Sequence, residues 1–294
     1  MEGAITTKIC AITNGISQDY ETSCKVLKET GVEYAELQEV NGKRIEYATL
    51  DDARKIRDLN KAYGIKVASV TTHAFVGIGV GGIEVGDAKY NEQMALLKNG
   101  FEIAKIVGAD YVRTMCFARQ VVVFGEDGAD QWVSGGNKSW PKFLELFKPI
   151  VGAAKEVGVK LIVENGFNGM LTSAWTFRKM KEDLGEDAPV WFLWDPVNAL
   201  NVHEAAYPDA YNCIRKDLAH LHIKDALVNT VHSSVKCVPL GEGDMAPYLK
   251  GLADALRADG YTGCVSLENI YRPKGGDFVD GYRIDIETLK KIFA

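Results

Sequence analysis

The stretch Lys160-Leu-Ile-Val-Glu164-Asn-Gly166 is a short apolar run that ends abruptly in a carboxylate and a turn signal. Three later stretches repeat this pattern: Val190-Trp-Phe-Leu-Trp-Asp195-Pro, Leu218-Ala-His-Leu-His222-Ile-Lys-Asp and Cys264-Val-Ser-Leu-Glu268-Asn. Short apolar runs bounded by turn residues are typical of parallel strands that are covered on both faces. The pattern therefore predicts four buried strands, each of which delivers an ionisable side chain at its C-terminal end.

The rest of the chain extends this pattern to eight units of strand and helix. The predicted strands are 8–13, 34–40, 66–73, 109–116, 160–164, 190–195, 218–225 and 264–268. The predicted helices are at about 19–29, 50–63, 90–107, 141–157, 172–184, 207–216, 247–258 and 282–293. Strict alternation indicates an α/β protein with a parallel sheet, and eight units in 294 residues favour a closed barrel. We therefore predict a single (β/α)8 TIM barrel domain over residues 1–294.

Composition limits the possible partners of the chain. The formal net charge is -6 and Lys and Arg are scattered, so the basic stripe that nucleic-acid binding needs is lacking. No apolar stretch approaches the ~18 residues that span a bilayer, and the N-terminus lacks the pattern of a secretory signal. The six cysteines are dispersed, which predicts neither a disulfide framework nor a structural zinc site. We expect a cytoplasmic protein with no nucleic-acid or membrane partner.

The polar side chains at the strand ends should converge, because the C-terminal ends of barrel strands form the active-site face. They are His73, Arg113, Glu164, Asp195, His222 and Glu268. Any one of them is equally well explained as a helix cap or a surface charge. Caps and surface charges do not explain four consecutive strands that end in Glu, Asp, His and Glu. Three carboxylates in one pocket repel one another, and a cation relieves that repulsion. Glu164, Asp195, His222 and Glu268 are therefore candidate ligands of one divalent metal, Mn, Mg, Co or Zn.

Other polar residues are candidates for substrate binding. Asn198 follows Asp195 by three residues and is placed to face a substrate hydroxyl. Lys224 follows His222 by two residues and should point to the same side of its strand. His220 shares that period but lies deeper, which favours a histidine of the barrel interior. Arg113 is suited either to a substrate carboxylate or phosphate or to a structural salt bridge.

Residues in the loops leave more alternatives open. Glu242 in Gly241-Glu-Gly-Asp244 and Arg272 after the last strand either reach the pocket or are solvated loop charges. The loop 118–138 contains Phe124 and Trp132, which either cover a substrate or pack against a partner subunit. A homo-oligomer is therefore possible.

The strand-end motifs together resemble the sugar phosphate isomerase/epimerase superfamily. The motifs are the Glu at the end of strand five, Asp-Pro-x-Asn, His-x-His-x-Lys-Asp, Gly-Glu-Gly-Asp and Ser-Leu-Glu. That superfamily has xylose isomerase-like TIM barrels and includes ketose 3-epimerases, hydroxypyruvate isomerase, inosose dehydratase and endonuclease IV. The resemblance runs from the first strand to Phe293. It implies one divalent metal held by Glu164, Asp195, His222 and Glu268, with Glu164 and Glu268 also acting as the catalytic acid/base pair.

Two departures from the superfamily pattern bear on the activity. Epimerases that resemble this chain usually carry a His three residues after the strand-six Asp, where this chain has Asn198. The superfamily nucleases need an Asp-x-His after strand seven, where this chain has Val231-His232-Ser233. His73 matches a nuclease ligand, but the set of nuclease ligands is incomplete. The departures argue against a nuclease and against naming a ketose 3-epimerase specifically.

The resemblance implies proton transfer next to a carbonyl group. We expect a divalent-metal-dependent isomerase or epimerase that acts on a keto-sugar or keto-polyol through an enediolate, with Glu164 and Glu268 moving the proton. One alternative is a metal-dependent dehydratase or lyase that acts on a keto-polyol or keto-glycoside, similar to inosose dehydratase. The other is a sugar-binding barrel without catalytic activity.

Overall fold

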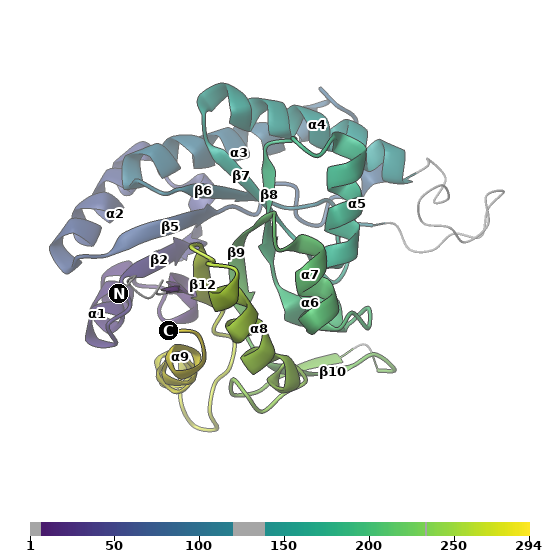
Figure 1. Cartoon of the computed structure of the whole chain (residues 1–294). Helices are drawn as coiled ribbons and strands as arrows, with labels where there is room; N and C mark the ends of the chain where they lie inside the picture. The colour runs from purple at the N-terminus through teal and green to yellow at the C-terminus, as the bar shows by residue number, and fades with distance from the viewer. Residues whose placement is uncertain (1–6, 120–138, 233) are drawn as a thin grey trace.

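The computed structural model describes residues 7–119, 139–232 and 234–294. Its centre is a closed barrel of eight parallel strands, in the order β1-β12-β9-β8-β7-β6-β5-β2 (Figure 1). These strands are β1 (Lys8–Ile12), β2 (Tyr34–Leu37), β5 (Lys66–Thr71), β6 (Tyr111–Thr114), β7 (Lys160–Glu164), β8 (Val190–Trp194), β9 (Leu218–Ile223) and β12 (Cys264–Leu267). The barrel closes where β1 pairs in parallel with β12, with Lys8 opposite Cys264. The predicted (β/α)8 barrel is confirmed.

Helices surround this barrel (Figure 1). They are α1 (Tyr20–Glu29), α2 (Leu50–Tyr63), α3 (Ala88–Val107), α4 (Ser139–Val157), α5 (Ala174–Leu184), α6 (Pro196–Leu200), α7 (Tyr211–Ile214), α8 (Ala246–Ala258) and α9 (Phe278–Phe293). Short 3-10 turns lie at Thr13–Gly15, Ile45–Tyr47 and Val80–Gly82. The sequence defines several helix ends sharply: Thr49 and Asp52 form a capping box before α2, and Gly64 ends that helix in the left-handed conformation.

Most predicted elements agree with the structure to within two residues at each end, and three differ by more. The second strand ends at Leu37, because Asn41 and Gly42 turn the chain with positive φ and pair β3 (Glu39–Val40) with β4 (Lys43–Arg44). The predicted helix 207–216 is wrong in its first half: a π-helical turn spans Ala206–Ala210 and Tyr207 has an extended backbone. The last helix starts earlier than predicted because Asp277 caps it. The antiparallel hairpin of β10 (Ala226–Asn229) and β11 (Ser234–Cys237) was not predicted.

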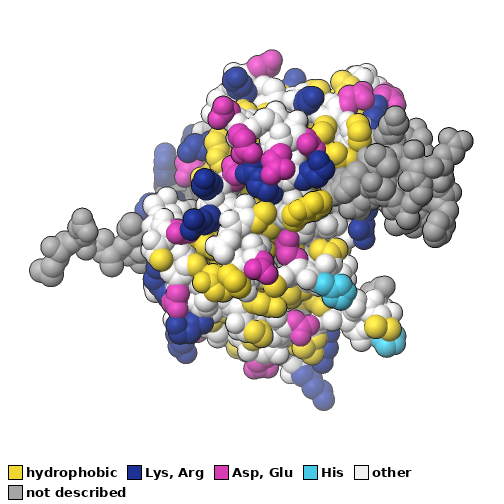
Figure 2. Space-filling view, turned by 45° about the vertical axis from the view of Figure 1, so that its right-hand side comes forward, with side chains coloured by type: hydrophobic (Ala, Val, Ile, Leu, Met, Phe, Trp, Pro, Cys, Tyr) yellow, Lys and Arg dark blue, Asp and Glu magenta, His cyan; other side chains and the backbone are white. Residues whose placement is uncertain are grey.

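The surface visible in Figure 2 carries interspersed charges of both signs. Lys and Arg side chains lie among Asp and Glu side chains on this face, without a continuous basic patch. Among the described residues, no helix has the length and apolar character needed to cross a membrane. The six cysteines are free, and four of them are buried.

Close packing of α9 against the loop after β12 gives a test of the fold. A Cβ atom at Gly281 would lie 2.0 Å from the Tyr271 carbonyl oxygen. Gly281→Ala should therefore lower the free energy of unfolding by about 2 kcal/mol through overpacking. The matched control is Gly152→Ala in α4, where nothing lies within 4 Å of the added atom and stability should rise by up to about 1 kcal/mol. Urea denaturation measures both, and a Gly281→Ala variant as stable as the wild type would contradict the packing described.

Candidate active site and metal centre

The alternation of side chains along four neighbouring strands builds the site. In β7, Leu161 and Val163 pack outward into the main apolar core, so Ile162 and Glu164 point into the barrel. In β9, Leu221 and Ile223 pack outward in the same way, which turns His220 and His222 inward. The same period places Asp195 after β8 and Glu268 after β12 at the inner rim.

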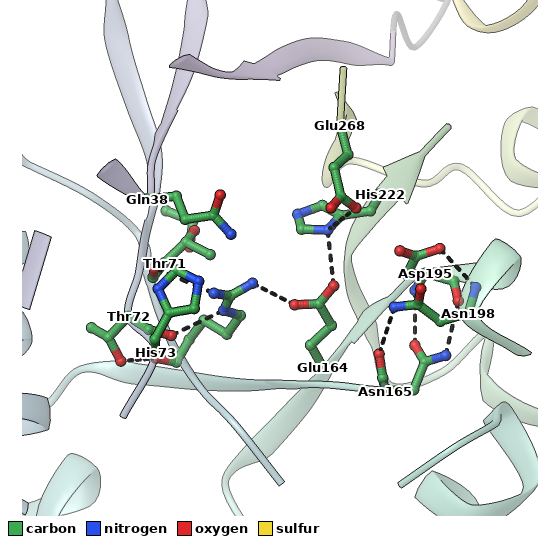
Figure 3. Close-up of polar contacts among 12 residues, drawn as sticks. Gln38, Thr71, Thr72, His73, Glu164, Asn165, Asp195, Asn198, His222 and Glu268 are labelled. Carbon is green, nitrogen blue, oxygen red and sulfur yellow. Dashed lines mark hydrogen bonds and ion pairs between the residues drawn. The ribbon is translucent and has the colours of Figure 1, made fainter. Parts of the chain in front are cut away.

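The structure brings the four predicted metal ligands together. Glu164, Asp195, His222 and Glu268 each offer one ligand atom, and these atoms lie within 4.8 Å of one another. His222 Nδ1 lies 3.2 Å from Glu164 Oε1 and 3.5 Å from Glu268 Oε2. Figure 3 shows both carboxylates directed at this side of the His222 ring. Three of the four side chains are almost fully buried, and that of Glu268 is 22% exposed.

The electrostatics of this group indicate an excess of buried negative charge. Burial, opposed by the charge of Lys224 and helped by the charges of Glu268 and Glu164, raises the pKa of Asp195 to about 7. Burial would also raise the pKa of Glu268, but Lys224 and His222 outweigh it and hold that pKa well below its ordinary value. Asp195 Oδ2 is buried and, although the Lys224 ammonium group lies beside it, no described residue donates a well-directed hydrogen bond to it. Three carboxylates and one imidazole nitrogen that converge in this way are a donor set that suits a divalent cation.

Two buried cationic side chains, Lys224 and Arg113, form ion pairs with carboxylates of the site. Lys224 Nζ lies 2.5 Å from Asp195 Oδ2 and 2.8 Å from Glu268 Oε2, so this side chain points into the site as predicted. Arg113 is 3% exposed, forms a buried ion pair with Glu164 and donates from Nε to the Thr72 carbonyl at 3.1 Å. The structural salt bridge, one of the two alternatives for Arg113, is therefore present.

Asn198 braces the ends of two strands. Its side-chain amide donates to the Asn165 carbonyl at 2.9 Å, and its backbone N–H donates to Asp195 Oδ1 at 3.2 Å. Asn165 in turn accepts from the Asp195 N–H at 2.9 Å and donates to the Asp195 carbonyl at 2.8 Å (Figure 3). Asn198 Oδ1 is buried without a hydrogen-bond partner among the described residues. Its contact with a substrate hydroxyl stays a prediction.

The remaining predicted substrate residues differ in their exposure and in their neighbours. His73 lies on the opposite side of the site from Asp195 (Figure 3) and its side chain is 18% exposed. Burial, helped by the charge of Arg113, lowers the pKa of His73 to about 3, which makes it neutral. Glu242 is exposed, and the exposed Arg272 lies over the Phe278 ring at 4.7 Å. Phe124 and Trp132 lie outside the described residues.

Two buried carboxylates were not predicted as parts of the site. Glu36 in β2 is fully buried and contacts both histidines of the His-x-His motif. Asp225 is 2% exposed and accepts hydrogen bonds from the backbone N–H groups of residues 226, 241, 243 and 245 at 2.9–3.0 Å. The signal for Glu36 was available, because a glutamate between Ala35 and Leu37 interrupts an apolar strand. His220 is fully buried inside the barrel, as predicted.

Comparisons with known proteins agree with this fold. The E. coli 3-keto-D-glucoside 4-epimerase YcjR, in its apo form, has a TM-score of 0.72 at 16% identity, over 97% of this chain and 100% of that chain. A xylose isomerase-like TIM barrel protein from Mycobacterium smegmatis in complex with magnesium has a TM-score of 0.66 at 17% identity, over 100% of both chains. The probable 3-DHS dehydratase AsbF from Bacillus anthracis has a TM-score of 0.69 at 11% identity, over 98% of both chains.

At these identities the structural likeness shows the fold alone. A search of the curated proteins found no match. The sequence model of the family described as xylose isomerase-like TIM barrel matches residues 24–292, which is most of the chain. The chain therefore belongs to the xylose isomerase-like TIM barrel family.

Proposed function

We propose that the protein is a metal-dependent sugar isomerase or epimerase that acts on a keto-sugar or keto-polyol by proton transfer. The observation that carries this proposal is the pair Glu164 and Glu268, whose carboxylates approach the same nitrogen of His222 at 3.2 and 3.5 Å. The epimerase and the dehydratase among proteins of the same fold support a sugar-modifying enzyme. Among these activities, the paired glutamates favour proton transfer.

Glu164, Asp195, His222 and Glu268 would hold one divalent cation, for which Mn, Mg, Co and Zn are the candidates. A cation bound there supplies electrostatic stabilisation for the negative charge that develops on a substrate oxygen when the neighbouring carbon loses its proton. The crowded carboxylates of the site support this assignment, because burial and the charges of Glu268 and Glu164 raise the pKa of Asp195 to about 7.

Each of the two glutamates has a cationic partner of its own. Arg113 pairs with Glu164, and Lys224 pairs with Glu268 at 2.8 Å. Although burial opposes it, the charges of Arg113 and His222 lower the pKa of Glu164, so both glutamates are carboxylates ready to accept a proton. In this proposal one glutamate removes the proton next to the carbonyl. Return by the opposite glutamate inverts the carbon, whereas return to the neighbouring carbon moves the carbonyl.

The test uses the wild-type protein in D2O with a panel of keto-sugars and keto-polyols. Metal content is measured by elemental analysis before and after chelation, and products are analysed by mass spectrometry. Near-stoichiometric metal and metal-dependent deuterium incorporation without loss of water are expected. A product that has lost water would identify the dehydratase alternative. A protein that binds none of the four metals and exchanges no deuterium would contradict the proposal and leave a sugar-binding barrel.

Removal of the Lys224 charge gives an independent prediction about the metal. In Lys224→Met, Asp195 and Glu268 lose their shared ammonium group, and breaking such a buried pair costs about 3–5 kcal/mol. The variant should therefore be less stable than the wild type in EDTA. Saturating MnCl2 should raise its Tm by more than it raises the wild-type Tm, because a cation then neutralises the unpaired carboxylates.

Scanning calorimetry with EDTA and with MnCl2 measures both effects. The control is Lys250→Met, which removes an 88% exposed lysine from a surface ion pair with Asp254 and should leave the manganese-induced shift unchanged. Equal shifts in Lys224→Met and the wild type would mean that the lysine and the metal do not share these carboxylates.

A further inference from the structure

A fully buried glutamate lies beneath the proposed metal ligands. Glu36 lies in β2, and four side chains from three other strands contact its carboxylate at hydrogen-bond distance. Glu36 Oε1 contacts His222 Nε2 at 2.9 Å and Thr71 Oγ1 at 2.5 Å. Glu36 Oε2 contacts His220 Nε2 at 2.8 Å and Ser266 Oγ at 2.7 Å. Every donor to this carboxylate is a side chain that points into the barrel.

These contacts determine which nitrogen of His222 carries a hydrogen atom. An ionised carboxylate only accepts hydrogen bonds, so His222 must present Nε2–H to Glu36. A metal binds the neutral form of the ring, in which Nδ1, the atom that faces Glu164 and Glu268, then carries the free lone pair. Metal-ligating histidines generally donate their other ring N–H to a carboxylate or carbonyl, which fixes the tautomer and the ring orientation.

We propose that Glu36 is the positioning residue of the metal centre, holding the His222 ring so that Nδ1 is presented as the ligand atom. This inference rests on the proposed function. His220 on β9, Thr71 on β5 and Ser266 on β12 hold the Glu36 carboxylate in place. The two histidines of the His-x-His motif therefore have different roles: His222 would bind the metal, and His220 supports Glu36. Glu36 acts through His222 and touches no reacting atom.

Glu36 and His220 also belong to a second group of potential metal ligands, but their hydrogen bonds argue against a metal there. Cys10, Glu36 and His220 also place ligand atoms within 4.8 Å of one another. However, both Glu36 oxygens already accept two or more hydrogen bonds from buried donors, and a cation there would displace them. The contacts therefore fit a support for His222 better than a separate metal site.

The first experiment reads the tautomer in the unaltered protein. Wild-type protein labelled with ¹⁵N-histidine is loaded with Zn²⁺, a diamagnetic probe, and studied by NMR. His222 should show a hydrogen on Nε2 and none on Nδ1. A zinc-loaded wild type in which Nε2 is the metal-bound or unprotonated nitrogen would overturn the inference without any variant.

The second experiment measures zinc affinity by chelator competition. Glu36→Gln keeps the size of the side chain but replaces one acceptor oxygen by an NH₂ group, which opposes the histidine N–H donors. Zinc should bind 10- to 100-fold more weakly, the loss typical of removing a support behind a ligand. The matched control is Asp285→Asn, which alters a buried carboxylate of α9 that accepts a single backbone N–H from Leu240 at 2.9 Å. Its zinc affinity should equal that of the wild type.

The outcomes separate the inference from the proposed function. A wild type that binds none of the four metals contradicts the proposed function itself. A wild type that binds zinc and a folded Glu36→Gln that binds it equally well overturn only the role of Glu36. If Glu36→Gln does not fold, Thr71→Val and Ser266→Ala each remove one donor to Glu36 and should weaken zinc binding several-fold. Unchanged affinity in both would also overturn the inference.

Discussion

Glu268→Gln is expected to lower kcat for the isomerase or epimerase reaction by about 10³-fold, because it removes one of the two groups that move the proton. Glutamine has nearly the same size but cannot accept or return a proton. Its amide oxygen also retains one acceptor toward Lys224, which lies 2.8 Å from the Glu268 carboxylate. The loss should therefore appear mainly in kcat, and the measurement is steady-state turnover with metal content determined in the same sample.

Deuterium exchange distinguishes the roles of the two glutamates. If Glu164 removes the proton and Glu268 returns one on the opposite face, Glu268→Gln should still exchange deuterium into the substrate without inverting it. Glu164→Gln should neither exchange deuterium into the substrate nor invert it. In this variant deuterium should exchange only into the product, from which Glu268 removes the proton. The matched control is Glu102→Gln in α3, an exposed glutamate paired with Lys105 on the surface, which should retain wild-type turnover. Full turnover by Glu268→Gln would exclude Glu268 from the chemistry.

Asp225→Asn is expected to lower the free energy of unfolding by about 3 kcal/mol. The buried carboxylate accepts from four backbone N–H groups, at Ala226, Gly241, Gly243 and Met245. The NH₂ group of asparagine accepts none of them, so two hydrogen bonds to a charged group are lost, at about 1.5 kcal/mol or more each. The Tm should fall by about 6–12 °C, as scanning calorimetry can measure.

Asp285→Asn is the control for this prediction. Asp285 accepts one backbone N–H, from Leu240, and burial raises its pKa to about 6. A neutral amide therefore replaces a carboxylate that is costly to ionise, and the loss of stability should stay below about 1 kcal/mol. Equal losses in the two variants would contradict the special role of Asp225.

The anchoring by Asp225 also explains the glycines of the Gly241-Glu-Gly-Asp244 motif. A Cβ atom at Gly243 would lie 2.2 Å from Asp225 Oδ1 and 2.7 Å from the Ala226 carbonyl oxygen. Gly241 has a φ of 95°, a backbone conformation that favours glycine. The loop is thus shaped around a carboxylate from the end of β9, next to Lys224 in the sequence.

The barrel and the four proposed ligands were predictable because both depend on local sequence pattern. The strand at Lys160–Glu164 is an apolar run of the right length, and its alternation determines which residues face inward. Glu36 was missed because its role depends on contacts across the closed barrel: its partner His222 is 186 positions away in the sequence. No local pattern pairs a residue of β2 with one of β9.

Boundaries and loops were less predictable for related physical reasons. The second strand stops early because a tight turn at Asn41 and Gly42 pairs the chain with itself, a local alternative that competes with the barrel. Glu242 and Arg272 lie in loops whose path depends on tertiary anchors such as Asp225. The stacking of Arg272 over Phe278 could not be predicted from periodicity, because Arg272 lies in the loop before α9.

The position of β12 has a consequence for the order in which the protein matures. Glu268 follows directly after this strand, which lies between β1 and β9 in the barrel. The strand β12 therefore connects the first strand of the barrel to a strand that comes late in the sequence. During synthesis the N-terminal strands emerge first, yet the four donors cannot meet until residues beyond 268 have left the ribosome. Metal acquisition by the proposed site would therefore follow closure of the barrel.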